Sequence, residues 1–482
     1  MSDPAKLFVT LTPWHDGQKI AFIDVSYLVH GFEPGPGDLL AQIHLEIVSI
    51  PACEFSEAGL TARDELGELP LSVSTGAGPY AQARQWRCGR QTQGPITIQY
   101  RVFPREVPET YTSSPYFDLR NEQGGINGAG VPFMVLLPEQ TYEISLHWDL
   151  SHMPAGSRGV WSKGEGDVTV TAPQSLLAFS FYAAGAVKTW KPAGNSPFEF
   201  HWLAEPGFDI EAVARNVYAL YQYISAFFQD SGAPFKVFAR KDPFKKSGGG
   251  TALSDSFMFG YSEAALPAPD EIQNLLAHEM VHNWPHLDEP EACRTWYDEG
   301  TAEYYSIVLP YRAGLSSLED VLRQLQERTH MYYGNPYRTI TSEAAVDLYW
   351  KDRRAQRVPY SRGLFYIISV DHAIRAASGG RRSVDDVVLA LVKKHRQEGK
   401  APKCADWLEA VSRELGRDAA PEFEAMHRGE LILPNNAWFG GVFKARPAVI
   451  PQYINKWDVS SETIDGYIWE RDLSIPEENA VI

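Results

Sequence analysis

The sequence predicts an α+β multidomain fold, in which an N-terminal antiparallel β-sandwich is followed by a small α/β lobe and a helical lobe. Three observations predict it. Short runs of alternating apolar and polar residues continue to about residue 175, the apolar spacing becomes helical from about residue 205, and two strand-like runs interrupt the helical part. The chain has 482 residues, which exceeds one ordinary hydrophobic core and favours two or three domains.

The first 175 residues are expected to form the β-sandwich. The segment ITIQYRVF (96–103) alternates between apolar and polar residues, as a strand with one buried face does. The segments YEISLHW (142–148) and DVTVTAP (167–173) continue this pattern. Clusters of Gly, Pro and Asn, such as EQGGINGAGVP (122–132), separate the runs and predict turns between antiparallel strands.

Residues 176–445 are expected to form the second domain. A helix is predicted from about residue 210, with Asp209 as its N-cap. Strands FKVFAR and SFMFGY follow on either side of the loop KKSGGG, and then come helices at DEIQNLLAHEMVHNW, GTAEYYSIVL and SRGLFYIISVDHAIRAA. The last of these is expected to end at Gly379, and Ser383 with Asp386 predicts a capping box for the next helix. Residues 446–482 form a tail without a predicted element.

Composition narrows the possible partners. The net charge of −17 argues against nucleic acid and anionic membranes, because phosphate binding needs clustered Lys and Arg. No apolar run is long enough for a membrane span, and the N-terminus lacks the pattern of a signal peptide. Four scattered cysteines without C-x-x-C spacing fit a reducing compartment. We therefore expect a cytoplasmic protein, and the sequence does not indicate an oligomeric state.

The segment LLAHEMVHNWP (275–285) carries a candidate metal site. On a helix, His278 and His282 share one face on adjacent turns, which suits two imidazole ligands of one Zn²⁺. Glu279 between them is placed to polarise a metal-bound water. The alternative is a helix that carries two hydrogen-bonded histidines without a metal.

A third ligand is expected downstream, because a catalytic zinc takes three protein ligands and keeps one open position. Glu299 lies ahead of a helical pattern, and an antiparallel helix would return it to the metal. Glu303, one turn later, either orients a ligand imidazole or is a solvated carboxylate. Pro285 interrupts the first helix, so His286 is expected in a loop or at the surface rather than among the ligands.

Several motifs in the same order resemble the glutamate-ligand zinc metallopeptidases (gluzincins), and within them the glycyl aminopeptidase family. HEMVHNW resembles the H-E-x-x-H-x-W motif of that family, and WYDEGTAEYY resembles its E-G-x-T-x-Y-Y motif. VPYSRG (358–363) resembles the P-Y-x-K-G element of the wider aminopeptidase group, and SVDHAIRAASGGRRSVDDVVLAL resembles a helix, glycine turn and helix of the family. The resemblance is specific from about 245 to 395 and diffuse before that.

The resemblance implies a thermolysin-like catalytic domain, a single Zn²⁺ per chain and a role for each matching residue. His278, His282 and Glu299 would hold zinc, and Glu279 would be the general base. Tyr360 would donate a hydrogen bond to the oxyanion of the tetrahedral intermediate; its alternative is a buried core tyrosine.

Two departures from the family pattern bear on the substrate. Related aminopeptidases carry a Gly-rich edge strand with a glutamate, and the carboxylate of that glutamate holds the substrate amine. Here SGGGTALSDSF keeps Gly248, Gly249 and Gly250, whose backbone is expected to bind an extended substrate together with Thr251 and Ala252, but it has no glutamate. Asp255 is the nearest acid. The second departure is the short tail, in which we expect no peptide-binding PDZ domain.

The first functional hypothesis is a zinc metallohydrolase of the glycyl-aminopeptidase type, which cleaves an amide bond in a peptide or small peptide-like molecule. The altered Gly-rich strand motivates a second hypothesis, in which the same fold acts on an ester, lactone or epoxide. The third is a non-catalytic binding protein that has kept the fold.

Overall fold

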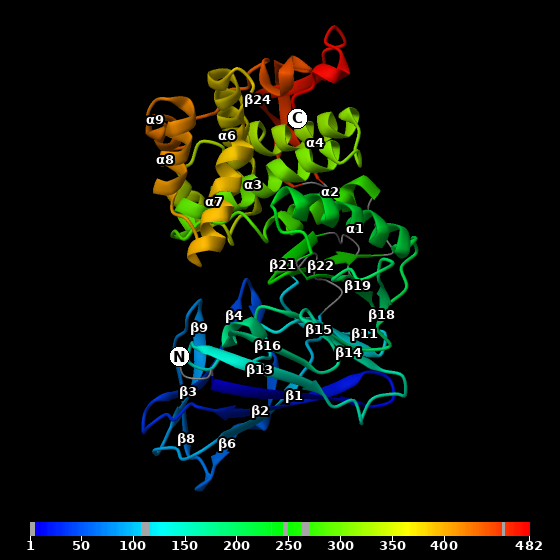
Figure 1. Ribbon diagram of the computed structural model, residues 1–482, viewed down its shortest axis with the longest axis vertical. Helices are drawn as coiled ribbons and strands as arrows, with labels where there is room; N and C mark the ends of the chain where they lie inside the picture. The colour runs from blue at the N-terminus through cyan, green and yellow to red at the C-terminus, as the bar shows by residue number, and fades with distance from the viewer. Residues whose placement is uncertain (1–4, 108–115, 233, 244–248, 263–268, 456–457) are drawn as a thin grey trace. The chain divides into compact units, whose positions relative to one another are not determined.

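The computed structural model describes residues 5–107, 116–232, 234–243, 249–262, 269–455 and 458–482 (Figure 1). The chain divides into two compact units. The first comprises Met1–Arg215 and Gly232–Pro267, and the second comprises Asn216–Ser231 and Ala268–Ile482. The boundary between the units falls within helix α1 (Ile210–Phe227). The domain limits drawn from the sequence, 1–175, 176–445 and 446–482, stay predictions.

The largest sheet of the first unit has seven strands in the order β16-β13-β1-β2-β10-β6-β7. Their bounds are β1 Ala5–His15, β2 Ile20–His30, β6 Glu54–Asp64, β7 Gly67–Glu68, β10 Ile96–Phe103, β13 Thr141–Trp148 and β16 Val168–Pro173. Most neighbours are antiparallel, but β13 pairs with β1 in parallel, with Ala5 opposite Tyr142. The sheet therefore departs from the expected antiparallel sandwich at the β1–β13 pair, because a long crossover separates β1 from β13 in the chain and permits parallel pairing.

Two further sheets share the core of the first unit. One has the order β3-β9-β8 and the other the order β11-β12-β17-β14-β15. Their strands are β3 Leu39–His44, β8 Leu71–Ala77, β9 Gln82–Cys88, β11 Leu119–Glu122, β12 Gly125–Ala129, β14 Arg158–Trp161, β15 Gly164–Glu165 and β17 Phe181–Gly185. Val25, Trp86 and Tyr182 come from the three sheets and belong to one buried cluster. Strand β17 lies beyond residue 175, so β structure continues further along the chain than the sequence indicated.

A five-stranded sheet with the order β18-β19-β20-β22-β21 completes the first unit. It consists of β18 Lys188–Trp190, β19 Phe198–Trp202, β20 Phe235–Lys241, β21 Gly249–Leu253 and β22 Ser256–Tyr261. Strand β21 is an edge strand, antiparallel to β22, with Gly250 opposite Phe259. Gly249 and Gly250 therefore begin a strand rather than end the predicted loop 245–250, because their backbone pairs with β22. Gly248 lies outside the described residues.

The second unit is mainly helical in the residues described. Its further helices are α2 Pro269–Val281, α3 Glu291–Arg312, α4 Leu318–Tyr333, α5 Ser342–Leu348, α6 Arg353–Ser378, α7 Val384–Glu398, α8 Cys404–Leu415 and α9 Ala420–His427. Helix α2 ends three residues before the predicted Trp284, and the amides of Asn283 and Trp284 close turns onto Met280 and Val281 ahead of Pro285.

Helix α6 begins eight residues before the predicted Ser361. The Asp352 carboxylate accepts a hydrogen bond from the Arg354 amide at 2.9 Å and caps the helix there. At the other end, Gly379 takes the left-handed conformation with φ 63°, which confirms the expected end. The capping box of Ser383 and Asp386 before α7 is confirmed as well. Asp209 also caps α1, since its Oδ1 accepts from the Ala212 amide at 2.9 Å.

The tail, which had no predicted element, forms a β-hairpin. Strands β23 (Phe443–Tyr453) and β24 (Val459–Arg471) are antiparallel and pack against α4 (Figure 1). The Trp469 amide on β24 donates to Gln326 Oε1 on α4 at 2.7 Å. The hairpin is thus an integral part of the helical unit.

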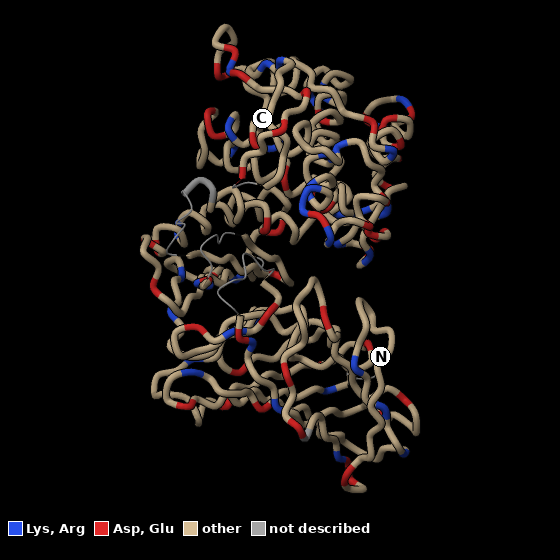
Figure 2. Tube along the Cα trace, turned by 180° about the vertical axis from the view of Figure 1, so that it is seen from behind, with Lys and Arg blue, Asp and Glu red and all other residues tan. Residues whose placement is uncertain are grey.

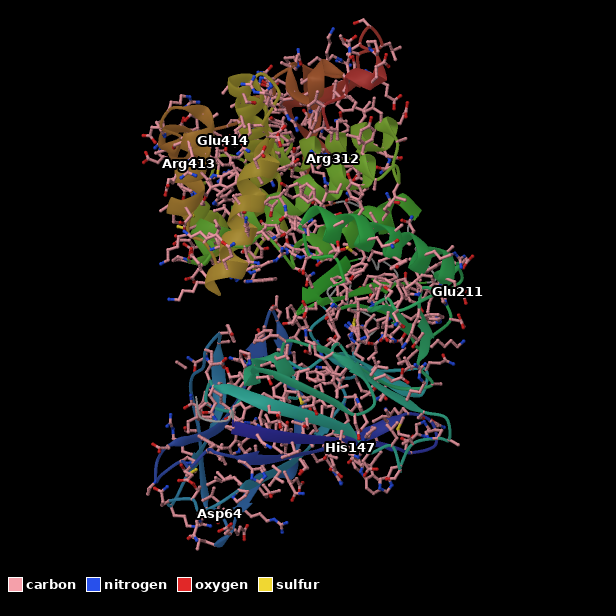
Figure 3. The ribbon with its side chains drawn as sticks, viewed as in Figure 1. Asp64, His147, Glu211, Arg312, Arg413 and Glu414 are labelled. Carbon is pink, nitrogen blue, oxygen red and sulfur yellow. The ribbon has the colours of Figure 1, made fainter. Side chains whose placement is uncertain are left out.

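Helices α3 and α6 cross in backbone contact and carry the residues of most interest. A Cβ added at Gly300 on α3 would lie 2.6 Å from the carbonyl carbon of Gly363 on α6. The far end of α3 is held by Arg312, which is labelled in Figure 3. Its Nη1 donates to Asp385 Oδ2 at 2.8 Å, and its Nε donates to the Ile482 carbonyl at 2.9 Å. Helix α3 is therefore fixed both at this crossing and at its C-terminal end.

Acidic and basic residues are interspersed along the trace of each unit (Figure 2). The acidic excess behind the net charge of −17 is therefore spread along the chain rather than gathered in one run. Among the described helices, none is both long and apolar enough to cross a membrane.

Candidate metal centre

Three side chains meet where the end of α2 and the turn that follows it pack against α3. His278 lies in that last turn, His282 lies one residue past the end of α2, and Glu299 lies on α3. The two Nε2 atoms of His278 and His282 are 3.2 Å apart. Glu299 Oε2 is 3.3 Å from His278 Nε2 and 3.5 Å from His282 Nε2.

These three distances fit a shared cation. Tetrahedral zinc with bonds of about 2.0–2.1 Å places neighbouring ligand atoms about 3.3 Å apart. His278, His282 and Glu299 are also the one set of His, Cys, Asp and Glu among the described residues whose potential ligand atoms converge in this way, all within 4.8 Å. A His-His-Glu set with neutral imidazoles is the donor chemistry that catalytic zinc uses.

The electrostatics of the trio favour a positive charge beside Glu299. Glu299 Oε2 is buried and accepts no hydrogen bond of good geometry. Burial alone would raise the pKa of Glu299, but the charge of His282 and contacts from both imidazoles hold that pKa well below its usual range. Burial likewise lowers the pKa of His282, yet the Glu299 carboxylate outweighs it and raises the pKa to about 9. The site thus favours a cation next to Glu299, either a proton on His282 or a metal.

Glu303 connects this centre to a network of polar side chains. Its Oε1 lies 3.6 Å from His278 Nδ1, and its Oε2 accepts from Arg328 Nε at 2.7 Å. Arg328 in turn donates to Asn274 Oδ1 at 2.5 Å. Glu303 is only 5% exposed. The alternative of a solvated helix carboxylate was therefore wrong, because α3 turns this face toward α2 and α4, and Glu303 faces the second nitrogen of His278.

Tyr360 on α6 lies against the same histidine. Its ring is parallel to that of His278, with centroids 5.9 Å apart. The hydroxyl of Tyr349 donates to the Tyr360 hydroxyl oxygen at 3.2 Å. Burial, together with the Glu299 charge, holds the pKa of Tyr360 well above its ordinary value. Tyr360 therefore stays a neutral phenol near pH 7 and keeps a proton to donate.

Glu279 and His286 flank the histidine pair. Glu279 is half-buried on α2, and its charge contributes to the raised pKa of His282. His286 lies in a loop after α2, as the position of Pro285 indicated. Its ring contacts that of His395 on α7 with centroids 4.8 Å apart, and burial lowers its pKa to about 4. His286 is thus a neutral loop residue apart from the three converging ligand atoms.

The candidate substrate-binding strand belongs to the first unit. Gly249, Gly250, Thr251 and Ala252 lie on the edge strand β21, where Thr251 Oγ1 accepts from the Tyr116 amide at 3.1 Å. Asp255, the nearest acid, occupies the turn after β21 with φ 52° and forms an ion pair with Lys163. The carboxylate of Asp255 therefore already has a cationic partner within its own unit.

Four residues around the centre were missed from the sequence: Asn274, Arg328, Tyr349 and Arg357. No motif marks them. Asn274 lies 4 positions before His278, Arg328 lies 29 positions after Glu299, and Tyr349 and Arg357 lie 11 and 3 positions before Tyr360. Their placement depends on how α4, α5 and α6 pack around α2 and α3, which local periodicity does not encode.

The sequence matches no family model and no curated protein. Solved structures are similar in fold. An aminopeptidase N family protein from Idiomarina loihiensis has a TM-score of 0.71 and 12% identity, covering 92% of this chain and 80% of that chain. An M1 zinc metallopeptidase from Deinococcus radiodurans, in a mutant form bound to a Tyr-Ser-Ala substrate, has a TM-score of 0.54 and 14% identity, covering 90% and 96%. A further structure of an M1 zinc metallopeptidase from Deinococcus radiodurans has a TM-score of 0.53 and 15% identity, covering 89% of this chain and 95% of that chain.

These neighbours confirm the fold expectation at a coarse level. The chain has the mixed α+β multidomain fold of M1 zinc metallopeptidases, which are gluzincins. Because the sequence identity is only 12% to 15%, the similarity shows a shared fold and not a shared activity. The closer resemblance to glycyl aminopeptidases stays a prediction.

Proposed function

We propose that the chain is a zinc-dependent peptidase that removes an amino-terminal residue from a peptide or small peptide-like molecule. The observation that carries this proposal is the convergence of His278 Nε2, His282 Nε2 and Glu299 Oε2 at 3.2 to 3.5 Å. A shared fold with M1 zinc metallopeptidases supports it. One Zn²⁺ per chain would be held by these three residues, and when bound it supplies a Lewis acid that polarises a carbonyl and lowers the pKa of water.

Glu279 is the general base of this proposal. It follows His278 directly on α2 and is half-buried, so its carboxylate is shielded from bulk water while its charge reaches the histidine pair. It takes a proton from the attacking water and then passes that proton to the departing amine. Because the same group serves both steps, an uncharged glutamine at this position should stop turnover without removing a metal ligand.

Tyr360 stabilises the developing oxyanion. It is a neutral phenol that can donate its proton, and its hydroxyl oxygen is positioned by a contact of 3.2 Å with the Tyr349 hydroxyl. Glu303, held by Arg328, orients His278 through Nδ1 and fixes which ring nitrogen faces the metal. These groups all sit on packed helices, which keeps the donor geometry preorganised.

The Gly-rich strand supplies the proposed substrate contact. Strand β21 is an edge strand, and an edge presents backbone N–H and C=O groups with which an extended peptide can pair. We place Gly249 to Ala252 in this role, with Gly248 as part of the same sequence motif. The proposal includes one zinc ion and a peptide or small-molecule substrate. It also includes a cytoplasmic location, without nucleic acid or membrane partners.

A non-peptide substrate is the second candidate, and one observation favours it. The strand has no carboxylate where related aminopeptidases hold the substrate amine, and Asp255 is engaged with Lys163. A zinc centre with a phenol donor also suits esters, lactones and epoxides, whose reaction builds negative charge on oxygen. The third hypothesis, a non-catalytic binding protein, would leave the convergence of the three ligand atoms without a use.

Aminoacyl-coumarin amides that begin with Gly or Ala test the proposal, each measured beside its N-acetylated twin on protein of known zinc content. Cleavage of the free-amine forms alone supports an aminopeptidase. Cleavage of both forms supports a peptidase that does not read the amine. Zinc-loaded protein that cleaves neither form but hydrolyses an ester, lactone or epoxide panel would overturn the peptidase proposal in favour of the second candidate.

A further inference from the structure

Arg357 lies close to the candidate centre but has no role in the steps described so far. It precedes Tyr360 by one helical turn on α6, and its guanidinium carbon lies 4.5 Å from the centroid of the Tyr360 ring. The Tyr360 ring is also parallel to the ring of the proposed ligand His278, with centroids 5.9 Å apart. Arg357 therefore lies close to the proposed metal ligands. The side chain of Arg357 is half-buried. A cation is thus held above the ring of the proposed oxyanion donor.

Within the described part of the chain, the side chain of Arg357 forms no ion pair and no hydrogen bond, and its guanidinium lies over the Tyr360 ring. The charge of Glu303 acts on Arg357, but both carboxylate oxygens of Glu303 face other groups, one Arg328 at 2.7 Å and the other His278 at 3.6 Å. A partly buried guanidinium is stabilised when a carboxylate pairs with it. Because Arg357 is only half-buried, a ligand can reach its donors.

Two further guanidinium groups, those of Arg353 and Arg328, lie near Arg357. Tyr453 on β23 is 8% exposed. The charges of Arg357, Arg353, Arg328 and Glu303 all act on the pKa of its phenol. Burial raises the pKa of Tyr453, whereas the three guanidinium groups lower it. Arg328 is already paired with Glu303 at 2.7 Å and with Glu327 at 3.1 Å, whereas no carboxylate of the described residues forms an ion pair with the guanidinium of Arg357. A guanidinium in this position attracts an anion and discriminates against a neutral group.

We propose that Arg357 binds a carboxylate of the substrate, and that the enzyme therefore prefers short peptides with a negative charge next to the scissile bond. The inference rests on the proposed function and adds a substrate class to it. A planar guanidinium matches a carboxylate with two parallel hydrogen bonds. Either the C-terminal carboxylate of a dipeptide or an acidic side chain at the second residue supplies this chemistry.

Calorimetry on the zinc-loaded Glu279→Gln variant of the full chain tests the inference without turnover. The probes are Gly-Ala beside Gly-Ala amide, for the C-terminal source, and Gly-Glu amide beside Gly-Gln amide, for the side-chain source. We expect the charged member of at least one pair to bind about 10- to 100-fold more tightly, as a charge-assisted hydrogen bond requires. Equal binding within both pairs, or no binding of any probe, would overturn the inference.

Substitutions assign the effect to Arg357. Arg357→Met in the same background should bring the charged-to-neutral binding ratio close to one, and Arg357→Lys should restore part of it. Arg354→Met is the matched control: it removes a guanidinium one turn earlier on α6, where Arg354 already pairs with Asp352 at 2.6 Å. A ratio unchanged in Arg357→Met, or lost equally in Arg354→Met, would contradict the assignment, and Arg357→Lys keeps the test valid if the methionine variant does not fold.

Turnover by the unsubstituted chain distinguishes a failure of the peptidase proposal from a failure of the carboxylate site. If that protein hydrolyses none of the four probes while the calorimetric preference stands, the peptidase proposal fails and the carboxylate site remains. If it hydrolyses charged and neutral probes with the same kcat/KM, and Arg357→Met slows both alike, the peptidase proposal remains and the carboxylate site is wrong.

Discussion

Gly300 and Gly363 let the two helices that carry Glu299 and Tyr360 touch backbone to backbone. A Cβ at Gly363 would lie 2.0 Å from the Trp296 carbonyl oxygen, and one at Gly300 would lie 2.6 Å from the Gly363 carbonyl carbon. Each glycine is next to, or one turn from, a proposed site residue. The contact therefore sets the distance between a metal ligand and the oxyanion donor.

Gly363→Ala should separate α3 from α6, because the new methyl group has no space at the crossing. Overpacking of this kind costs about 1–3 kcal/mol of stability. We expect a lower melting temperature and a loss of turnover. Gly207→Ala is the control, since nothing lies within 4 Å of a Cβ at Gly207. Unchanged melting and activity in Gly363→Ala would contradict the close crossing.

Glu303→Gln should weaken zinc binding without removing a ligand. The substitution deletes the charge that faces His278 Nδ1 and the ion pair with Arg328. Loss of a group that orients a ligand lowers metal affinity about 10- to 100-fold. Competition with a zinc chelator measures this. Glu327→Gln, which removes the half-exposed partner of Arg328, should leave zinc affinity unchanged, and equal effects of the two variants would argue against the orienting role.

Tyr360→Phe should lower kcat much more than Tyr349→Phe does. Removing the oxyanion donor lowers kcat about 100- to 1,000-fold. Removing Tyr349 deletes only the bond that holds the Tyr360 hydroxyl at 3.2 Å, which corresponds to about a 2- to 10-fold loss in kcat with KM little changed. Steady-state kinetics check both, with Tyr366→Phe further along α6 as a control. A larger loss for Tyr349→Phe than for Tyr360→Phe would exchange the two roles.

Asp352 makes the start of α6 sensitive to acid. Hydrogen bonds from the Arg354 side chain lower the pKa of Asp352 to about 2, against about 3.9 in an unfolded chain. A lowered pKa contributes stability that is present above about pH 4 and lost as pH falls toward 2. Since the pair is partly exposed, we expect about 1 kcal/mol.

Asp352→Asn keeps a capping side chain and removes the charge, so it isolates this effect. Thermal unfolding of both proteins should show the variant less stable at pH 7, with the difference shrinking as the pH is lowered through about 4. A difference that is constant with pH would mean that the cap, rather than the charge, stabilises α6.

The fold class and the three proposed ligands could be read from the sequence, because both depend on local spacing. His278 and His282 are four residues apart, and Glu299 opens a second apolar helical pattern. The cap at Asp209 and the end at Gly379 were equally local, since each depends on one residue type at a helix terminus.

Features that depend on distant segments were not predictable in this way. The parallel pairing of β1 with β13 joins residues more than a hundred positions apart. The partner of Glu303 is Arg328 on the next helix, and only packing of α3 against α4 shows that this carboxylate is buried. Tyr349 and Arg357 likewise acquire their neighbours through the position of α6, not through a motif.

The most direct test is zinc content and turnover measured together on the unsubstituted chain and on Glu279→Gln. We expect one zinc per chain in both proteins and cleavage of free-amine aminoacyl substrates by the unsubstituted chain. In Glu279→Gln we expect turnover to fall at least about 100-fold, because a general base is removed. Near-normal turnover by Glu279→Gln, or no zinc in a freshly purified active protein, would contradict a zinc peptidase built on α2 and α3.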